Sequence, residues 1–226
     1  MESMLECLIV GGIETNCWIY SRLDFCALID PGDDAQDIIA FLSEKNLTPN
    51  YILLTHGHLD HLAALPDLAD FFRRENPRPL IAIHKGDSCY LGSASYPYHL
   101  ESMRAAARGG APGNDSGIEA YARQLWKPQP DPDALLDEAD TIGPFKVLHL
   151  PGHTPGSAAY FDEEAGILFS GDTLFCGDYG RTDLPGGNIS QLKQSLKRVF
   201  TLGKNINVCP GHGPVTTIGR EAGLIY

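Results

Sequence analysis

The sequence has no apolar run that approaches the roughly 20 residues of a transmembrane helix, so no helical membrane span is expected. It is also short of positive charge. Lysines and arginines number 17 against 29 aspartates and glutamates, which gives a formal net charge of -12 over 226 residues. Nucleic acids and anionic membranes are bound mainly by basic surfaces. The composition therefore argues against both as main partners.

A paired-cysteine motif is missing as well. The six cysteines show no C-x-x-C spacing; they are Cys7, Cys17, Cys26, Cys89, Cys176 and Cys209. Residues 1–6 are acidic, whereas a secretory signal begins with a basic region before a long apolar one. In a chain of this length free thiols are then expected rather than a disulfide framework, and we predict a reduced, cytoplasmic location.

What the sequence does contain is a series of short apolar runs that suit β-strands. With 43% hydrophobic and 20% charged residues, one domain spanning 1–226 with a substantial core is expected. Strands are predicted at 5–10, 17–20, 25–29, 51–54, 80–84, 139–142, 145–150, 157–161, 166–170 and 205–209. The run 51–54 has no polar alternation, which is typical of a strand buried on both faces.

Helices are predicted between these strands. Apolar residues at helical spacing indicate helices around 38–42 and at 66–74, 100–108, 118–126 and 189–200. We expect Asp33 or Asp34 to cap the first of them. The segment 86–133 is the least regular and is interpreted as a helical insertion. Helices on the outer faces of two strand sets predict an α/β fold with four layers.

A cluster of possible metal ligands follows the strand predicted at 51–54. His56 and His58 lie one residue apart on extended backbone, so their side chains point the same way and can bind one cation. Asp60 and His61 follow a turn, face differently and could bind a second cation. Imidazole and carboxylate suit zinc, iron or manganese. The alternative is a polar loop whose histidines face the solvent.

Three more candidate ligands lie far away in the sequence. His153, Asp172 and His212 each follow an apolar run and have glycine alongside, which lets the backbone crowd around an ion. Ligands at the carboxyl ends of several strands would converge on one edge of a layered fold. Five of the eight histidines belong to this set. Solvation alone does not explain that concentration.

These motifs, in this order, resemble the metallo-β-lactamase superfamily. The resemblance covers almost the whole chain outside the insertion and implies a four-layer αβ/βα sandwich. The segment 180–187 and the opening Thr15-Asn16-Cys17 are similar to those of short, glyoxalase II-like hydrolases. The family is therefore identified from four separated motifs rather than from one.

The resemblance also implies a division of the ligands between two divalent metal ions. One metal would be held by His56, His58 and His153, the other by Asp60, His61 and His212, with Asp172 bridging the two. A shared water whose pKa falls from about 15.7 to about 7 would then supply a hydroxide nucleophile. Asp172 would bridge and Asp60 would orient this hydroxide. Zinc is favoured, and iron or manganese are alternatives.

The implied reaction is hydrolysis of a thioester, with S-lactoylglutathione as the natural family substrate. Two-domain glyoxalase II enzymes bind glutathione with a carboxy-terminal helical domain, whereas this sequence ends at Tyr226. Another thioester, a lactone or another ester therefore remains open. Superfamily members that cleave nucleic acid carry a further domain and a basic surface, which the sequence does not show.

Two other functional classes compete with hydrolysis. Persulfide dioxygenases share the fold and a similar Gly-Arg-Thr-Asp segment but use one iron. Its ligands here would be His56 or His58, together with His153 and Asp172. A non-catalytic, metal-stabilised protein is the third hypothesis, but no ligand is missing, so the sequence gives it no support. Whether the protein is a monomer or a dimer is not indicated.

Some further residues have a functional and a structural interpretation. Arg181 could bind an anionic substrate or pair with Asp183 or Asp178. Cys176, close to Asp172, is interpreted as a small buried thiol rather than a ligand.

Several aromatic and histidine side chains are similarly ambiguous. Tyr96, Tyr98 and His99 lie in the insertion and could form the wall of a substrate pocket, pack on the surface or form a dimer contact. His84 and His149 are interpreted as core or loop residues.

Overall fold

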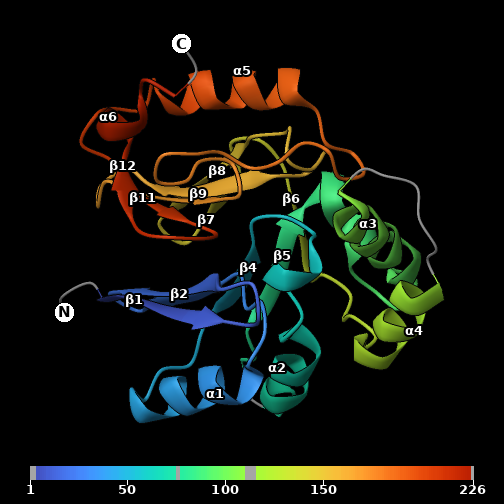
Figure 1. Cartoon of the computed structure of the whole chain (residues 1–226). Coiled ribbons are helices and arrows are strands. Elements are labelled where there is room, and N and C mark those ends of the chain that lie inside the picture. Colours follow the sequence, from blue (N-terminus) through green and yellow to red (C-terminus); the bar gives the residue numbers. More distant parts are fainter. Residues whose placement is uncertain (1–3, 75–76, 110–115, 225–226) are drawn as a thin grey trace.

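The computed structural model describes residues 4–74, 77–109 and 116–224 of the chain. Two β-sheets face each other (Figure 1). The first sheet contains, in spatial order, β1 (Met4–Val10), β2 (Thr15–Arg22), β3 (Phe25–Ile29), β4 (Tyr51–Leu54), β5 (Leu80–His84) and β6 (Ala134–Leu136). The second contains β12 (Thr216–Thr217), β11 (Asn207–Pro210), β10 (Ile167–Gly171), β9 (Ala158–Asp162), β8 (Phe145–His149) and β7 (Thr141–Ile142).

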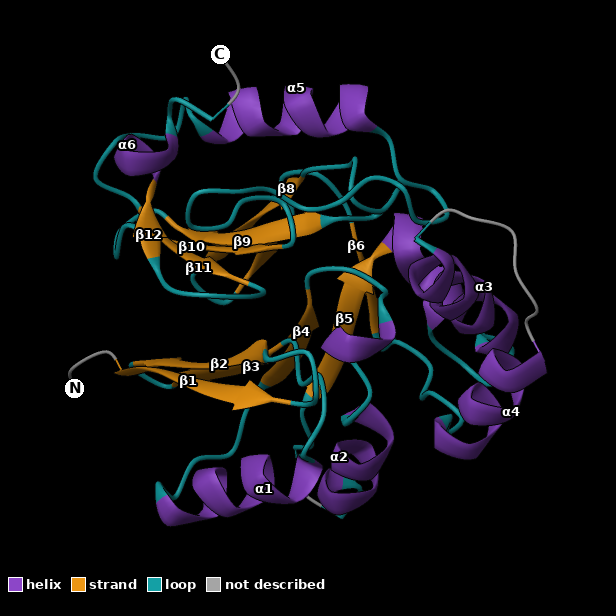
Figure 2. Ribbon diagram, viewed as in Figure 1, coloured by secondary structure: helices purple, strands orange, loops and turns teal. Residues whose placement is uncertain are grey.

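Helices complete the layers. They are α1 (Ala35–Glu44), α2 (Leu65–Phe72), α3 (Tyr96–Arg108), α4 (Ser116–Leu125), α5 (Ile189–Val199) and α6 (Ile218–Glu221), with the short 3-10 helices η1 (Leu59–His61) and η2 (Lys85–Tyr90). Helices α1 and α2 cover the first sheet and α5 covers the second, while α3 and α4 lie at the side (Figure 2). Within the described residues, none of these helices is long and apolar enough to cross a membrane.

Apolar side chains fill each space between neighbouring layers. Ile38 of α1 and Leu65 of α2 are fully buried against the first sheet. Tyr20 and Phe145 pack between the sheets, with ring centroids 5.4 Å apart. Leu196 of α5 is buried on the second sheet. Burial of a large aliphatic side chain contributes about 1.5–3 kcal/mol, so these layers hold the strand ends in fixed relative positions.

Parallel pairing gathers the functional loops. Strands β3, β4, β5 and β6 are mutually parallel in the first sheet, as are β10 and β11 in the second. The carboxyl ends of parallel strands lie at the same edge of a sheet, where ligand sites form. The loops after β3, β4, β10 and β11 therefore meet at one end of the sandwich.

The predicted α/β fold with four layers is confirmed, with corrections at particular elements. The strand β6 was not predicted. The strand expected at 139–142 shortens to β7, because Ala139 lies in a turn with a φ of 65°. Helix α3 begins at Tyr96 rather than at residue 100, with Pro97 in its first turn, where proline is tolerated.

The predicted cap of the first helix is confirmed in position, at Asp34, but not in its hydrogen bond. Asp34 precedes α1, but its side chain makes no capping hydrogen bond. Its carboxylate instead accepts a hydrogen bond from Gly11 N at 2.9 Å, in the turn after β1. A contact between distant segments thus replaces the local one. The single domain with an insertion at 86–133 remains our proposal.

Candidate metal centre

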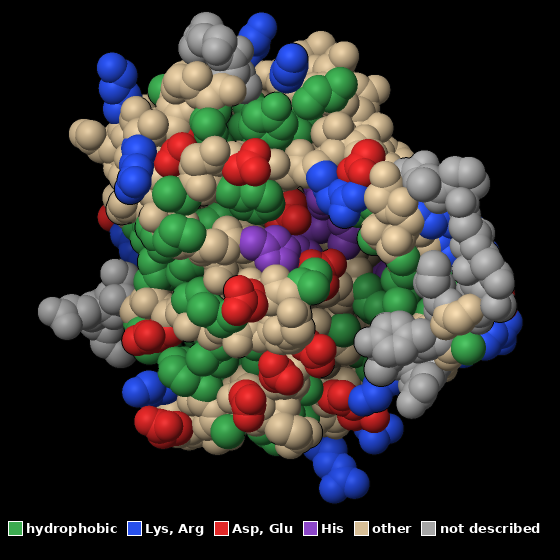
Figure 3. Space-filling view, in the orientation of Figure 1, with side chains coloured by type: hydrophobic (Ala, Val, Ile, Leu, Met, Phe, Trp, Pro, Cys, Tyr) green, Lys and Arg blue, Asp and Glu red, His purple; other side chains and the backbone are tan. Residues whose placement is uncertain are grey.

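A cavity of about 810 Å³ opens at the end of the sandwich where these loops meet. Histidine side chains gather in a hollow at the centre of this face, next to acidic side chains (Figure 3). Five candidate ligands are among the residues that line the cavity: His58, Asp60, His153, Asp172 and His212. The structure thus brings together residues that the sequence separates widely.

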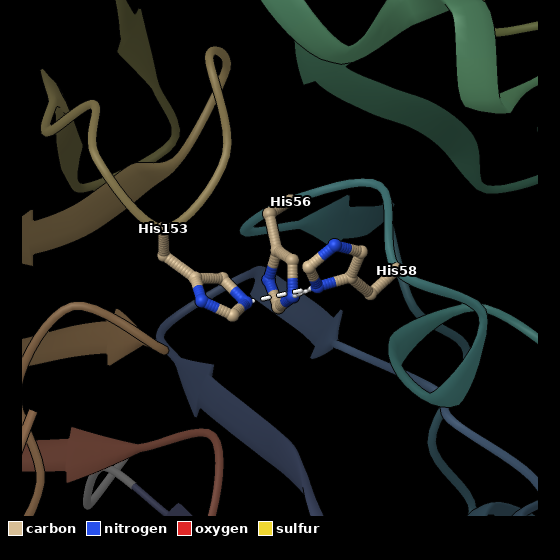
Figure 4. A group of neighbouring side chains, drawn as sticks. All are labelled: His56, His58 and His153. Carbon is tan, nitrogen blue, oxygen red and sulfur yellow. Dashed lines mark hydrogen bonds between the residues drawn. The ribbon is translucent and has the colours of Figure 1, made fainter. Parts of the chain in front are cut away.

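The first histidine set converges through its nitrogen atoms. His56 Nε2 lies 3.1 Å from His58 Nδ1, which lies 2.9 Å from His153 Nε2 (Figure 4). All three rings are buried. Tetrahedral zinc with Zn–N bonds of about 2.0–2.1 Å separates its nitrogen ligands by about 3.3 Å. The three nitrogens are therefore spaced as ligands of one small cation would be.

A second set lies beside the first. Asp60 Oδ2 is 3.3 Å from His61 Nε2 and 3.3 Å from His212 Nε2. His61 comes from η1, whereas His212 follows β11 of the other sheet. The backbone N–H of Asn16, in β2, donates to Gly211 O at 2.7 Å and holds the loop of His212 in place. This set can also hold one cation.

Asp172, which follows β10, contacts both sets. Its Oδ2 lies 3.6 Å from His153 Nε2 and 3.8 Å from His212 Nε2, and its Oδ1 lies 3.4 Å from His61 Nε2. Both His61 Nε2 and Asp172 Oδ1 are buried and lack a hydrogen-bond partner among the described residues. Buried polar atoms without partners are costly unless a ligand satisfies them. The geometry therefore suits a carboxylate shared by two cations.

Most of these rings are oriented by a partner at the nitrogen that points away from the centre. The contacts are His56 Nδ1 with Thr55 Oγ1 (3.1 Å), His61 Nδ1 with Asp30 Oδ2 (3.0 Å), His153 Nδ1 with Arg181 O (2.7 Å) and His212 Nδ1 with Glu14 O (3.3 Å). An acceptor at the outer nitrogen keeps the proton there and leaves the inner lone pair for a metal. The four rings are thus prepared as ligands.

Asp30 and Thr55 are functional residues that the sequence analysis missed. Asp30 is buried at the end of β3 and accepts hydrogen bonds from Thr55 N at 2.7 Å and Thr55 Oγ1 at 2.6 Å, besides its contact with His61. In the sequence, Asp30 looked only like the end of a strand. Its position at the carboxyl end of the strand next to β4 was the available signal.

The charges differ between the two sets. Burial, followed by the neighbouring imidazoles, holds the pKa of His56 and His58 well below the usual range, so both rings are neutral at pH 7. Burial raises the pKa of Asp60, but His61 and His212 together outweigh it and hold that pKa well below its usual value. Burial lowers the pKa of His61, but Asp172 and other carboxylates outweigh it and raise that pKa. In the second set, an ionised carboxylate therefore faces an imidazole that favours its protonated form, and a bound cation would take the place of that proton.

The candidate substrate residues divide into two groups. Arg181 and His99 line the cavity, whereas Tyr96 and Tyr98 are not among its described lining residues. Arg181 donates two hydrogen bonds to Asp183, at 2.6 and 2.7 Å, so its guanidinium is already paired. His99 is buried, and its Nε2 lies 2.8 Å from a backbone carbonyl.

The remaining candidates have structural surroundings. Tyr96 packs against Trp126, with ring centroids 5.1 Å apart. Cys176 is a half-buried free thiol outside the ligand groups found among the described residues. The rings of His84, at the end of β5, and His149, at the end of β8, stack with their centroids 4.0 Å apart.

Comparison with known proteins gives consistent matches. A family model described as the metallo-beta-lactamase superfamily matches residues 10–212. A probable metallo-hydrolase, YqgX of Bacillus subtilis, is 36% identical over 94% of this chain and 91% of its own length. The hydroxyacylglutathione hydrolase GloC of Haemophilus influenzae is 34% identical over 96% of this chain and 94% of its own length.

Solved structures agree with this result. The BLEG-1 B3 metallo-beta-lactamase has a TM-score of 0.78 and 32% identity, covering 98% of this chain and 99% of that chain. The protein TTHA1623, solved in a di-iron-bound form, has a TM-score of 0.77 and 35% identity, covering 96% of this chain and 97% of that chain.

Proposed function

The chain belongs to the metallo-β-lactamase superfamily, and from that premise we propose that it is a binuclear hydrolase of thioesters. The observation that carries the proposal is the position of Asp172. This one carboxylate lies within 4 Å of nitrogen ligands from both sets, at 3.6 Å from His153 and 3.4 Å from His61. A single-metal site would not need the second set, which is complete.

The residues fit two divalent metal ions. We assign His56, His58 and His153 to one metal, Asp60, His61 and His212 to the other, and Asp172 to both. Two bound cations supply an acidified water and polarise the substrate carbonyl. Imidazole and carboxylate suit zinc, iron and manganese. The di-iron form of TTHA1623 supports a pair of metals, and zinc remains our first choice.

The chain's own residues would provide orientation and charge. Asp60 is 27% exposed at the cavity, so its carboxylate can accept a hydrogen bond from a water molecule and orient it toward the substrate. Asp30, which accepts a hydrogen bond from Thr55, holds the ring of the neighbouring His61 in place. A thiolate is a good leaving group, so the reaction does not demand a strong proton donor.

The choice of a thioester as the substrate class is supported by the sequence identity of about a third that this chain shares with GloC, a hydroxyacylglutathione hydrolase. The cavity of about 810 Å³ has room for an acyl group and a thiol. We keep Arg181 and His99 as substrate contacts, because both line this cavity. Tyr96 and Tyr98 remain predictions. The six free cysteines are consistent with the cytoplasmic location that we also propose.

The test couples metal analysis to a substrate panel. Protein prepared without added metal should contain close to two transition-metal ions per chain and cleave thioesters under nitrogen. Protein that holds no such ion and gains no activity from any would refute the proposal. Oxygen consumption with glutathione persulfide, without thioester cleavage, would favour the single-iron dioxygenase instead.

A variant provides the first specific prediction. Asp172→Ala should lower the rate of thioester cleavage by at least about 100-fold, because it removes the carboxylate that both metal sets share. Asp178→Ala is the matched control. Asp178 lines the same cavity, but its carboxylate accepts a hydrogen bond from the neighbouring Tyr179 N, at 2.8 Å, and belongs to neither ligand set, so this variant should retain activity. Equal activity in the two variants would contradict the assigned bridge.

A further inference from the structure

Asp87 is a buried carboxylate that belongs to neither ligand set. It lies in η2, the short helix that follows β5 and opens the segment interpreted as an insertion. Its exposed fraction is 0%, and no ion pair of Asp87 occurs within the described residues. A buried carboxylate without a counterion is rare unless several hydrogen bonds satisfy it.

Those hydrogen bonds come from the two loops that carry the first histidine set. Asp87 Oδ2 accepts from Gly57 N at 2.9 Å and from Thr154 Oγ1 at 2.7 Å, and Oδ1 accepts from Gly156 N at 2.6 Å. Gly57 lies between His56 and His58, whereas Thr154 directly follows His153. One carboxylate therefore connects the loop after β4 with the loop between β8 and β9.

The packing around these hydrogen bonds leaves no free space. A Cβ atom on Gly156 would lie 2.3 Å from Asp87 N, and one on Gly57 would lie 2.1 Å from a ring carbon of Tyr90. Both approaches are shorter than any real Cβ contact. The helix η2 thus lies directly against the two loops, and only glycine permits this approach.

We propose that Asp87 is a positioning residue that fixes His153 relative to His56 and His58, and so sets the affinity of the first metal set. The proposal rests on the proposed metal-dependent function. It follows from the topology, because the two loops belong to different sheets and Asp87 adds a side-chain cross-link, next to the histidines themselves, to the backbone hydrogen bond from Ala158 N to Thr55 O. The hydrogen bonds of Asp87 within the described part of the chain go to Gly57, Thr154 and Gly156, which lie beside the first set, so the second set should depend on it much less.

The main test is metal affinity, which does not require turnover. Asp87→Asn removes one acceptor, because the amide nitrogen must face one of three donors. The zinc affinities of this variant and of the wild type can be measured by competition with a chelator. One of the two zinc-binding steps should be about 10- to 100-fold weaker in the variant, which is the range found when an outer partner of a metal ligand is lost. The other step should be unchanged.

The matched control is Asp162→Asn. Asp162, at the end of β9, is also buried, at 1% exposure; it accepts hydrogen bonds from Tyr20 Oη at 2.8 Å and Ala165 N at 2.9 Å and, unlike Asp87, pairs with Arg22 at 3.2 Å. Its loss should lower the melting temperature without changing either zinc affinity. If both zinc affinities fall equally in both variants, Asp87 is only a general stabiliser and the proposal is wrong.

A second pair of variants covers the case in which Asp87→Asn does not fold. Thr154→Val removes the hydroxyl that donates a hydrogen bond to the Asp87 carboxylate. Thr154→Ser keeps a hydroxyl at this position. The valine variant should weaken the same zinc step and the serine variant should recover it. Two unaltered zinc steps in the valine variant would overturn the proposal. A wild-type protein that binds no zinc would instead overturn the proposed function, so the two failures can be told apart.

Discussion

At the scale of single residues, the centre depends on atoms that never reach a substrate. The Nδ1 of His61 faces Asp30, which is in turn held by Thr55. This pairing keeps the proton of the imidazole on the outer nitrogen and fixes the ring plane. A buried carboxylate that orients a ligand contributes to metal affinity almost as directly as the ligand does.

Asp30→Asn should therefore weaken metal binding at the second set. We expect a fall of about 10- to 100-fold in affinity and in kcat/KM, the range typical of such outer partners. Zinc competition with a chelator and steady-state thioester cleavage would measure the two effects. Asp30 contacts His61 directly and reaches His56 only through Thr55, whereas Asp87 serves the first set, so Asp30→Asn and Asp87→Asn should each weaken a different zinc step most strongly. If the same step weakens most in both variants, the division into two sets is incorrect.

The sequence predicted the seven ligand candidates to meet at one edge of the fold, and the structure brings them together, while their role as metal ligands stays a prediction. It could not predict Asp30 or Asp87. Neither has a local pattern that differs from an ordinary turn or helix start, and both act through contacts with residues 25 or more positions away. For Arg181, the sequence left two interpretations, and the side chain pairs with Asp183.

At the scale of elements, the stack of His84 on His149 joins the end of β5 to the end of β8. Burial, followed by His149, lowers the pKa of His84 to about 4. This value already includes a lowering by Lys85 and an opposing rise caused by the nearby carboxylates of Asp137 and Glu138. In the unfolded chain, by contrast, a histidine titrates near its ordinary value of about 6.5.

Stability should consequently fall as pH falls from about 6.5 to about 4, because the unfolded state then binds a proton that folded His84 does not. We expect His84 to account for a loss of about 1–2 kcal/mol in the free energy of unfolding, after allowance for screening by the nearby charges. His84→Asn keeps an acceptor for Gly86 N but does not titrate, so it should lose less stability over this interval. Denaturant unfolding at several pH values would measure the difference. Identical slopes for the two proteins would exclude the effect.

Elements differed in how well the sequence indicated them. The helix α5 was predicted within a residue, since Leu192, Leu196 and Val199 follow its period and Asn188 caps it through Gln191 N. By contrast, β6 is three residues long and exists only because it pairs with β5. Short segments of this kind are defined by their neighbours, and local propensity does not specify them.

At the scale of the whole molecule, net charge should influence which substrates arrive quickly. The chain carries a formal charge of -12, and the two cationic side chains found on the cavity lining, Lys127 and Arg181, are both paired with aspartates. Electrostatic repulsion slows the encounter with anions, and salt screens it within about 8–10 Å at physiological ionic strength.

For an anionic substrate such as S-lactoylglutathione, kcat/KM should thus rise as ionic strength increases from about 0.01 M to about 0.15 M. A neutral thioester of N-acetylcysteamine should show little change, and it serves as the control. Stopped-flow or steady-state assays at subsaturating substrate would measure both. If kcat/KM for the glutathione thioester falls with salt, the bound metals outweigh the acidic surface and the cavity attracts anions.

The contact between β2 and the loop of His212 has a consequence for biosynthesis. Asn16 Nδ2 donates to Gly213 O, 197 residues away, and an isolated bridge pairs Thr15 with His212. Ribosomes release the amino-terminal part first, so His56, His58 and Asp60 emerge long before their partners. A nascent chain can offer only an incomplete set of the proposed ligands, and the two proposed metals could be loaded only after the last of these loops has left the ribosome.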